Sequence, residues 1–117
     1  MRILIVEDEK RLAMTLKDLL EQAGYQADMA FDGNGGLELA KSDIYDAVIL
    51  DVMLPLLNGF QVLRALRASG RMTPVLMLTA RGELADRVNG LDSGADYSLI
   101  LVVIRFVILK KNADEGI

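Results

Sequence analysis

The segment DAVILD, residues 46–51, sets the fold expected for this chain. Four apolar residues, 47–50, stand between its two aspartates, without the alternation of polar and apolar positions typical of a half-exposed strand. A continuous apolar run of this length indicates a strand buried on both faces, as in a parallel sheet that helices cover on both sides. Further strands are predicted at 3–6, 25–30 and 74–79.

Helical patterns alternate with these strands. Apolar residues recur at three- and four-residue steps in 10–23, and further helices are predicted around 37–40, at 60–68 and at 83–91. In the third of them, Phe60, Leu63 and Leu66 are expected to share one face. The alternation predicts an α/β fold, a doubly wound parallel sheet, in one domain of 117 residues.

Composition narrows the classes of function. The formal net charge is −4, which argues against a nucleic-acid binder. The chain has no cysteine and no histidine, so any metal would be a hard cation held by oxygen atoms. The N-terminal segment lacks the long apolar core of a signal peptide, and no apolar run reaches the roughly 18 residues that a membrane-spanning helix needs. We therefore expect a cytoplasmic protein that binds neither nucleic acid nor membrane.

Acidic residues close the predicted strands. Glu7 and Asp8 follow the first strand, Asp51 ends the third, and Thr79 ends the fourth. The carboxyl ends of parallel strands meet at one edge of a sheet, so these side chains are expected to converge if the three strands are neighbours. Clustered carboxylates favour a divalent cation such as Mg²⁺, and Asp51 becomes a candidate nucleophile that forms an aspartyl-phosphate. Taken singly, each acid could equally be a helix cap or a solvated loop residue.

Four stretches carry a family resemblance over residues 1–97: RILIVEDE (2–9), DAVILDVMLPLLNGFQVLRALR (46–67), TPVLMLTAR (73–81) and GLDSGADY (90–97). Together they resemble the receiver domain of bacterial two-component response regulators, in the style of receivers that precede a winged-helix DNA-binding domain. The resemblance implies a flavodoxin-like (CheY-like) fold with strand order 2-1-3-4-5. It also implies a signalling domain, not an enzyme, that takes its phosphoryl group from a sensor histidine kinase.

The resemblance assigns roles to single residues. Asp51 matches the phosphoacceptor, Thr79 the switch hydroxyl, and Tyr97 the switch aromatic. A Mg²⁺ site is implied at four positions: Glu7, Asp8, Asp51 and the backbone carbonyl of Met53. A haloacid-dehalogenase-type phosphatase is a less favoured function, since proteins of that class have a second aspartate at the position where this chain has Met53.

The match fails after about residue 97, in the stretch YSLILVVIRFVILKK (97–111). The family carries a Lys-Pro pair after its fifth strand, whereas Ile100 or Leu101 stands at the lysine position here. Without that positive charge beside the phosphoryl oxygens, we expect slow or absent phosphorylation and an impaired switch.

The segment 98–117 also replaces the amphipathic fifth helix with apolar residues, so the fifth strand and helix are expected to be altered. Apolar surface of this kind favours a homodimer or higher oligomer, through a hydrophobic interface or an exchanged C-terminal segment, which light scattering would test. A non-signalling, oligomerising receiver-like module, from a truncated, frame-altered or engineered chain, is the alternative function.

Overall fold

A parallel sheet forms the centre of the computed structural model, which describes residues 1–78. The strands of the described part follow the order β2-β1-β3-β4, and every neighbouring pair is parallel. The elements in chain order are β1 (Arg2–Val6), α1 (Lys10–Gln22), β2 (Gln26–Ala30), α2 (Gly33–Ala40), β3 (Ala47–Asp51), α3 (Gly59–Ala68) and β4 (Val75–Leu78). The predicted α/β class and the order 2-1-3-4 are confirmed. The fifth strand, the helix at 83–91 and the segment 98–117 lie outside the described residues.

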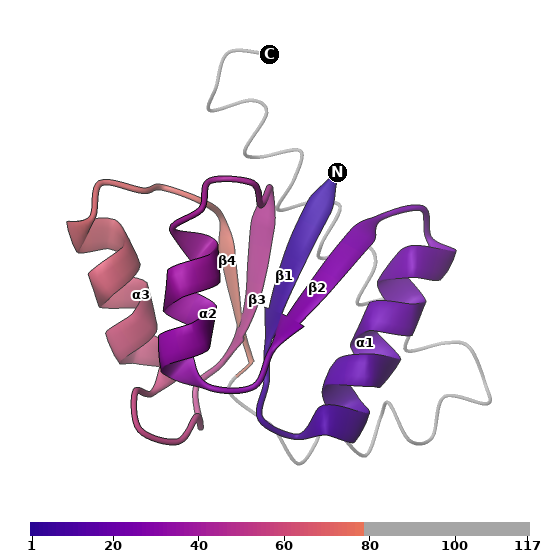
Figure 1. Ribbon diagram of the computed structural model, residues 1–117, viewed down its shortest axis with the longest axis horizontal. Coiled ribbons are helices and arrows are strands. Elements are labelled where there is room, and N and C mark those ends of the chain that lie inside the picture. The colour runs from indigo at the N-terminus through magenta and orange to yellow at the C-terminus, as the bar shows by residue number, and fades with distance from the viewer. Residues whose placement is uncertain (79–117) are drawn as a thin grey trace.

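Helices cover both faces of this sheet: α1 lies on one side, and α2 and α3 lie on the other (Figure 1). Successive side chains of a strand point to opposite faces. On β1, Ile3 and Ile5 accordingly pack in the cluster on the α1 side, whereas Leu4 and Val6 pack in the cluster on the α2 and α3 side. Every residue of β3 is buried, as the apolar run DAVILD predicted.

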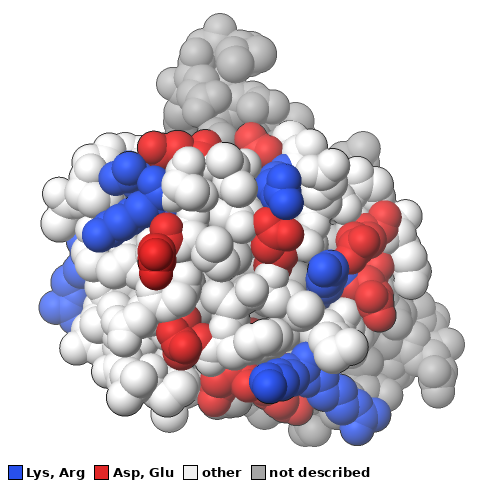
Figure 2. Space-filling model, in the orientation of Figure 1, with Lys and Arg blue, Asp and Glu red and all other residues white. Residues whose placement is uncertain are grey.

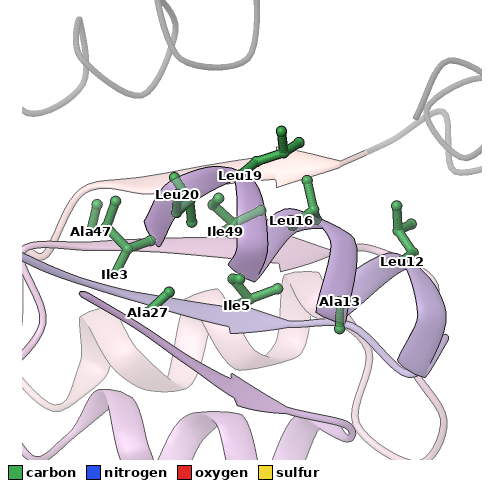
Figure 3. Packing of buried hydrophobic residues seen from close by; sticks show 10 residues of the cluster. All are labelled: Ile3, Ile5, Leu12, Ala13, Leu16, Leu19, Leu20, Ala27, Ala47 and Ile49. Carbon is green, nitrogen blue, oxygen red and sulfur yellow. The ribbon is translucent and has the colours of Figure 1, made fainter. Parts of the chain in front are cut away.

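The α1 cluster joins one helical stripe to three strands (Figure 3). Its members are Leu12, Ala13, Leu16, Leu19 and Leu20 of the helix with Ile3, Ile5, Ala27, Ala47 and Ile49 of the strands. Gly24 follows the helix with a φ of 94°, in the left-handed region where glycine is favoured at helix ends. The predicted helix and its stop at Gly24 are therefore confirmed.

One prediction about α3 is wrong. Phe60 was expected to share one face with Leu63 and Leu66, but Phe60 is 48% exposed, whereas Val62 and Leu66 are each 1% exposed. Three residues advance a helix by about 300°, so a strict three-residue row winds away from the sheet. The buried stripe instead combines steps of three and four residues, from Gly59 to Val62 to Leu66.

A polar network ties β1, β2 and the segment before β3 together. The Arg2 guanidinium donates to Asp28 Oδ2 at 2.8 Å, and the Tyr45 hydroxyl donates to the same oxygen at 2.7 Å. The hydrogen bond from Arg2 lowers the pKa of the Asp28 carboxyl, and the one from Tyr45 adds to this. Burial, followed by the hydrogen bond to Asp28, raises the pKa of Tyr45 to about 12.

This network predicts a loss of stability at alkaline pH. The pKa of Tyr45 is about 12 in the folded protein and 10.0 in an ordinary tyrosine, so the folded state holds its proton more tightly. The resulting stability is fully present below pH 10.0 and is lost as the pH rises toward 12. Denaturant titrations across that range should show a steeper fall for the parent than for Tyr45→Phe. At neutral pH the variant should lose about 1 kcal/mol, the usual net worth of one hydrogen bond. Equal alkaline slopes in the two proteins would contradict this role of Tyr45.

Candidate functional site

Strand register places two predicted acids beside each other. Ile5 of β1 pairs with Ile49 of β3, and both face α1. Glu7 stands two residues after Ile5, and Asp51 stands two residues after Ile49, so both continue these neighbouring rows at the carboxyl edge of the sheet. The Glu7 amide still donates to the Ala30 carbonyl at 3.0 Å, which extends the β1–β2 ladder to this residue. The central strands themselves therefore bring the two carboxylates together.

Asp8 completes a cluster of three carboxylates. Each of Glu7, Asp8 and Asp51 offers one oxygen, and these three oxygens lie within 4.8 Å of one another. The side chains of Glu7 and Asp51 are fully buried, and Asp8 is half-buried in the turn before α1. The structure thus gathers the three acids that the sequence analysis selected. Thr79 and Tyr97 lie outside the described residues, so their predicted roles stay predictions.

The chemistry of this cluster fits a hard divalent cation. Two unit charges 4.8 Å apart, the largest separation among these oxygens, repel each other by about 3.5 kcal/mol at an effective dielectric constant of about 20. A cation among the oxygens offsets that repulsion. All the side-chain donors are carboxylate oxygens, the ligands that Mg²⁺ takes in proteins while it keeps several waters. The residues present therefore suit Mg²⁺.

Met53 contributes through its backbone. Its amide donates to Asp51 Oδ1 at 3.1 Å and so fixes one oxygen of that carboxylate. The side chain of Met53 is 64% exposed. This arrangement agrees with a role for the main chain at this position, and the predicted metal contact of the Met53 carbonyl remains a prediction.

The loop that follows Asp51, residues 52–58, ends in a capped helix. Asn58 Oδ1 accepts from the Gln61 amide at 3.0 Å, and Gln61 Oε1 accepts from the Asn58 amide at 2.9 Å. This reciprocal pair is a capping box, and it starts α3 at Gly59, which lies against the backbone of Asp51. The role of Gln61 was not predicted, although an asparagine followed three residues later by glutamine is the sequence signal for a capping box.

Charged side chains of both signs lie near the carboxyl edge of the sheet. Figure 2 shows acidic and basic groups side by side at the lower edge of the view, where β1 and β3 end in Figure 1. Lys10, the first residue of α1, lies 5.4 Å from the centroid of the Phe31 ring, in cation–π contact. In the part of the chain that the structure describes, no helix combines the length and apolar character needed to cross a membrane.

Known proteins match this chain over most of its length. Residues 3–100 match the family described as response regulator receiver domain. The transcriptional regulatory protein DltR of Streptococcus agalactiae is 50% identical over 96 residues, which cover 82% of this chain and 43% of DltR. PcoR of Escherichia coli, also a transcriptional regulatory protein, is 52% identical over 99 residues, or 85% of this chain and 44% of PcoR. This chain thus spans less than half the length of these two relatives.

Solved structures agree with the sequence relatives. The receiver domain of Francisella response regulator 1452 is 28% identical, with a TM-score of 0.76 over 93% of this chain and 97% of that one. The non-phosphorylated receiver domain of HemR from Leptospira biflexa is 32% identical, with a TM-score of 0.72 over 92% of this chain and 93% of that one. The similarity therefore holds at the level of both sequence and fold.

Proposed function

Because the chain belongs to the response regulator receiver domain family, we propose that it is a phosphoacceptor domain of two-component signalling, with Asp51 as the acceptor. The observation that carries this proposal is the carboxylate cluster. Glu7, Asp8 and Asp51 place oxygens within 4.8 Å of one another at the carboxyl edge of a parallel sheet. In such sheets this edge is where ligands bind.

The proposed reaction moves a phosphoryl group from a sensor histidine kinase to Asp51. A carboxylate oxygen of Asp51 forms a bond to phosphorus as the bond between phosphorus and the kinase's imidazole nitrogen breaks. The bonding electron pair leaves with that nitrogen. The Met53 amide orients the attacking carboxylate through its hydrogen bond to Oδ1. When bound, Mg²⁺ supplies positive charge that neutralises the acids and the phosphoryl oxygens.

Three further assignments belong to this proposal. Glu7, Asp8, Asp51 and the Met53 carbonyl hold Mg²⁺; Thr79 donates a hydrogen bond to the phosphoryl group; and Tyr97 is the aromatic residue that responds to it. The names of DltR and PcoR support regulation of transcription as the output of the whole protein. The proposed location is the cytoplasm, and the apolar segment 98–117 supports a homodimer or higher oligomer.

The same proposal includes slow phosphorylation of Asp51 and an impaired switch, since Ile100 or Leu101 stands where the family has lysine. The decisive experiment combines Mg²⁺ titration with a small phosphodonor, acetyl phosphate, and follows the intact mass. We expect Mg²⁺ to bind, and phosphorylation to run about 10²–10³-fold slower than in receivers that carry the lysine, the usual cost of losing one hydrogen-bond donor to charge that develops in the transition state. Ile100→Lys or Leu101→Lys should recover part of that rate.

Each outcome of this experiment has a distinct meaning. Absence of Mg²⁺ binding would overturn the proposed metal site. Mg²⁺ binding without phosphorylation, even in the two lysine variants, would overturn the phosphoacceptor role and favour the non-signalling module. Rapid, stoichiometric and stable phosphorylation of Asp51 in the parent would refute only the expected slow phosphorylation.

A further inference from the structure

We propose that Gly33, the first residue of α2, is a positioning residue for the Mg²⁺ site, and that it acts through the loop 52–58. This inference rests on the proposed function. The backbone of α2 reaches that loop at Gly33 with no room for a side chain. A Cβ built at Gly33 would overlap the carbonyl oxygen of Leu57 and would lie 2.9 Å from both the carbonyl carbon and the Cβ of that residue.

The backbone of the loop around Leu57 is constrained by a hydrogen bond and by packing. The Leu57 amide donates to the Pro55 carbonyl at 2.8 Å, which closes a three-residue turn. The central residue of that turn, Leu56, has a φ of 67°, a conformation that side-chain-bearing residues rarely adopt. The side chains of Leu54 and Leu57 both pack in the cluster on the α2 and α3 side of the sheet. A displaced Leu57 carbonyl would therefore move its neighbours with it.

The other end of the loop is equally constrained. The Gly59 amide donates to the Val52 carbonyl at 3.0 Å, and a Cβ at Gly59 would overlap the carbonyl oxygen of Asp51. The loop between Asp51 and Gly59 is thus held at both ends, because Gly59 of α3 contacts the backbone of Asp51 and Val52, and α2 contacts the loop at Leu57. We therefore expect movement at Leu57 to reach Met53, four residues earlier in the same loop, whose amide donates to Asp51 Oδ1.

The helix α2 cannot easily move away to make room. Gly36, one turn after Gly33, is buried against Val6 of β1. A Cβ at Gly36 would lie 2.6 and 2.8 Å from the two methyl carbons of Val6, so the helix backbone already lies on the strand. Lifting α2 would open this contact and forfeit dispersion energy along the whole interface. With alanine at Gly33, the loop is therefore expected to take up much of the displacement.

The test measures Mg²⁺ affinity by calorimetric titration at a temperature where each variant is folded. We expect Gly33→Ala to bind Mg²⁺ about tenfold more weakly, the lower end of the cost of disturbing groups that support metal ligands. Gly35→Ala is the matched control on the same helix. Its Cβ would meet only the Asp32 carboxylate, at 3.2 Å, a side chain that accepts the Gly35 amide at 2.7 Å and needs to shift by only a few tenths of an ångström. The control should bind Mg²⁺ as the parent does.

A second pair of variants covers the case in which Gly33→Ala does not fold. Leu57 and Leu37 are both partly buried leucines packed against the same cluster, but only Leu57 belongs to the loop. Leu57→Ala should weaken Mg²⁺ binding, and Leu37→Ala should cost stability while it leaves the affinity unchanged.

The outcomes separate this inference from the function on which it rests. Loss of stability in Gly33→Ala or Leu57→Ala with parental Mg²⁺ affinity would show a purely structural role and overturn the inference. A parent that binds no Mg²⁺ would instead overturn the proposed function.

Discussion

Asp51→Asn is expected to abolish phosphorylation and to make the protein more stable in the absence of Mg²⁺. Asparagine has no nucleophilic carboxylate, so no phosphoryl group can be accepted at this position. It keeps the side-chain oxygen that accepts the Met53 amide at 3.1 Å, so the local geometry should survive. Removing one of three charges within 4.8 Å relieves two pairwise repulsions, so the free energy of unfolding should rise by about 1 kcal/mol or more.

The same substitution should remove the stabilising effect of Mg²⁺. Saturating ligand at about 100 times its dissociation constant stabilises a folded protein by about 2.7 kcal/mol, and the variant should forfeit most of this. The stability advantage of the variant over the parent should therefore shrink by about 2 kcal/mol or more when Mg²⁺ is added, as measured by urea titration with and without the ion. Asp18→Asn is the control, because Asp18 is an exposed acid of α1 and carries the same change of charge. A parental response to Mg²⁺ in Asp51→Asn would refute the role of Asp51 as a ligand.

The carboxylate cluster could be predicted because it follows from two local patterns and one rule of topology. An apolar run closed by an acid identifies a strand and its carboxyl end, and parallel strands place those ends at one edge. Glu7 and Asp51 satisfy both patterns, and the observed register sets them on neighbouring rows. The strand order was predicted from the family resemblance, and the described part of the sheet confirms the order 2-1-3-4.

Tertiary close approaches could not be predicted in the same way. The residues around Gly33 do not indicate that Leu57, 24 positions later, lies against the backbone of Gly33. That contact depends on how α2 and the loop pack on the same hydrophobic core. Phe60 shows a related limit: its spacing fitted a helical face, but packing selected the stripe through Val62 and Leu66. Thr79, Tyr97 and the segment 98–117 lie outside the described residues and remain predictions.

Gly59→Ala is expected to be strongly destabilising, although alanine normally has a higher helix propensity than glycine. A Cβ at Gly59 would overlap the Asp51 carbonyl oxygen and would lie 2.9 Å from Val52 Cα and 3.0 Å from the Asp51 carbonyl carbon. All three are backbone atoms of the strand end, so no side-chain rotation can relieve the overlap. We expect a loss of about 3 kcal/mol or more in the free energy of unfolding, at the upper end for overpacked sites.

The measurement compares thermal and urea unfolding of Gly59→Ala with those of Gly35→Ala. Both exchange glycine for alanine near the start of a helix, but the Cβ at Gly35 meets only the side chain of Asp32, 3.2 Å away, which caps the helix by accepting the Gly35 amide. The gain of up to about 1 kcal/mol from helix propensity should offset a small shift of this cap, so Gly35→Ala should change the stability by less than about 1 kcal/mol. For Gly59→Ala the melting temperature should fall by about 10 °C or more. Similar melting temperatures for the two variants would mean that α3 can move off the strand end without cost, which would contradict the close contact between Gly59 and the backbone of the proposed phosphoacceptor.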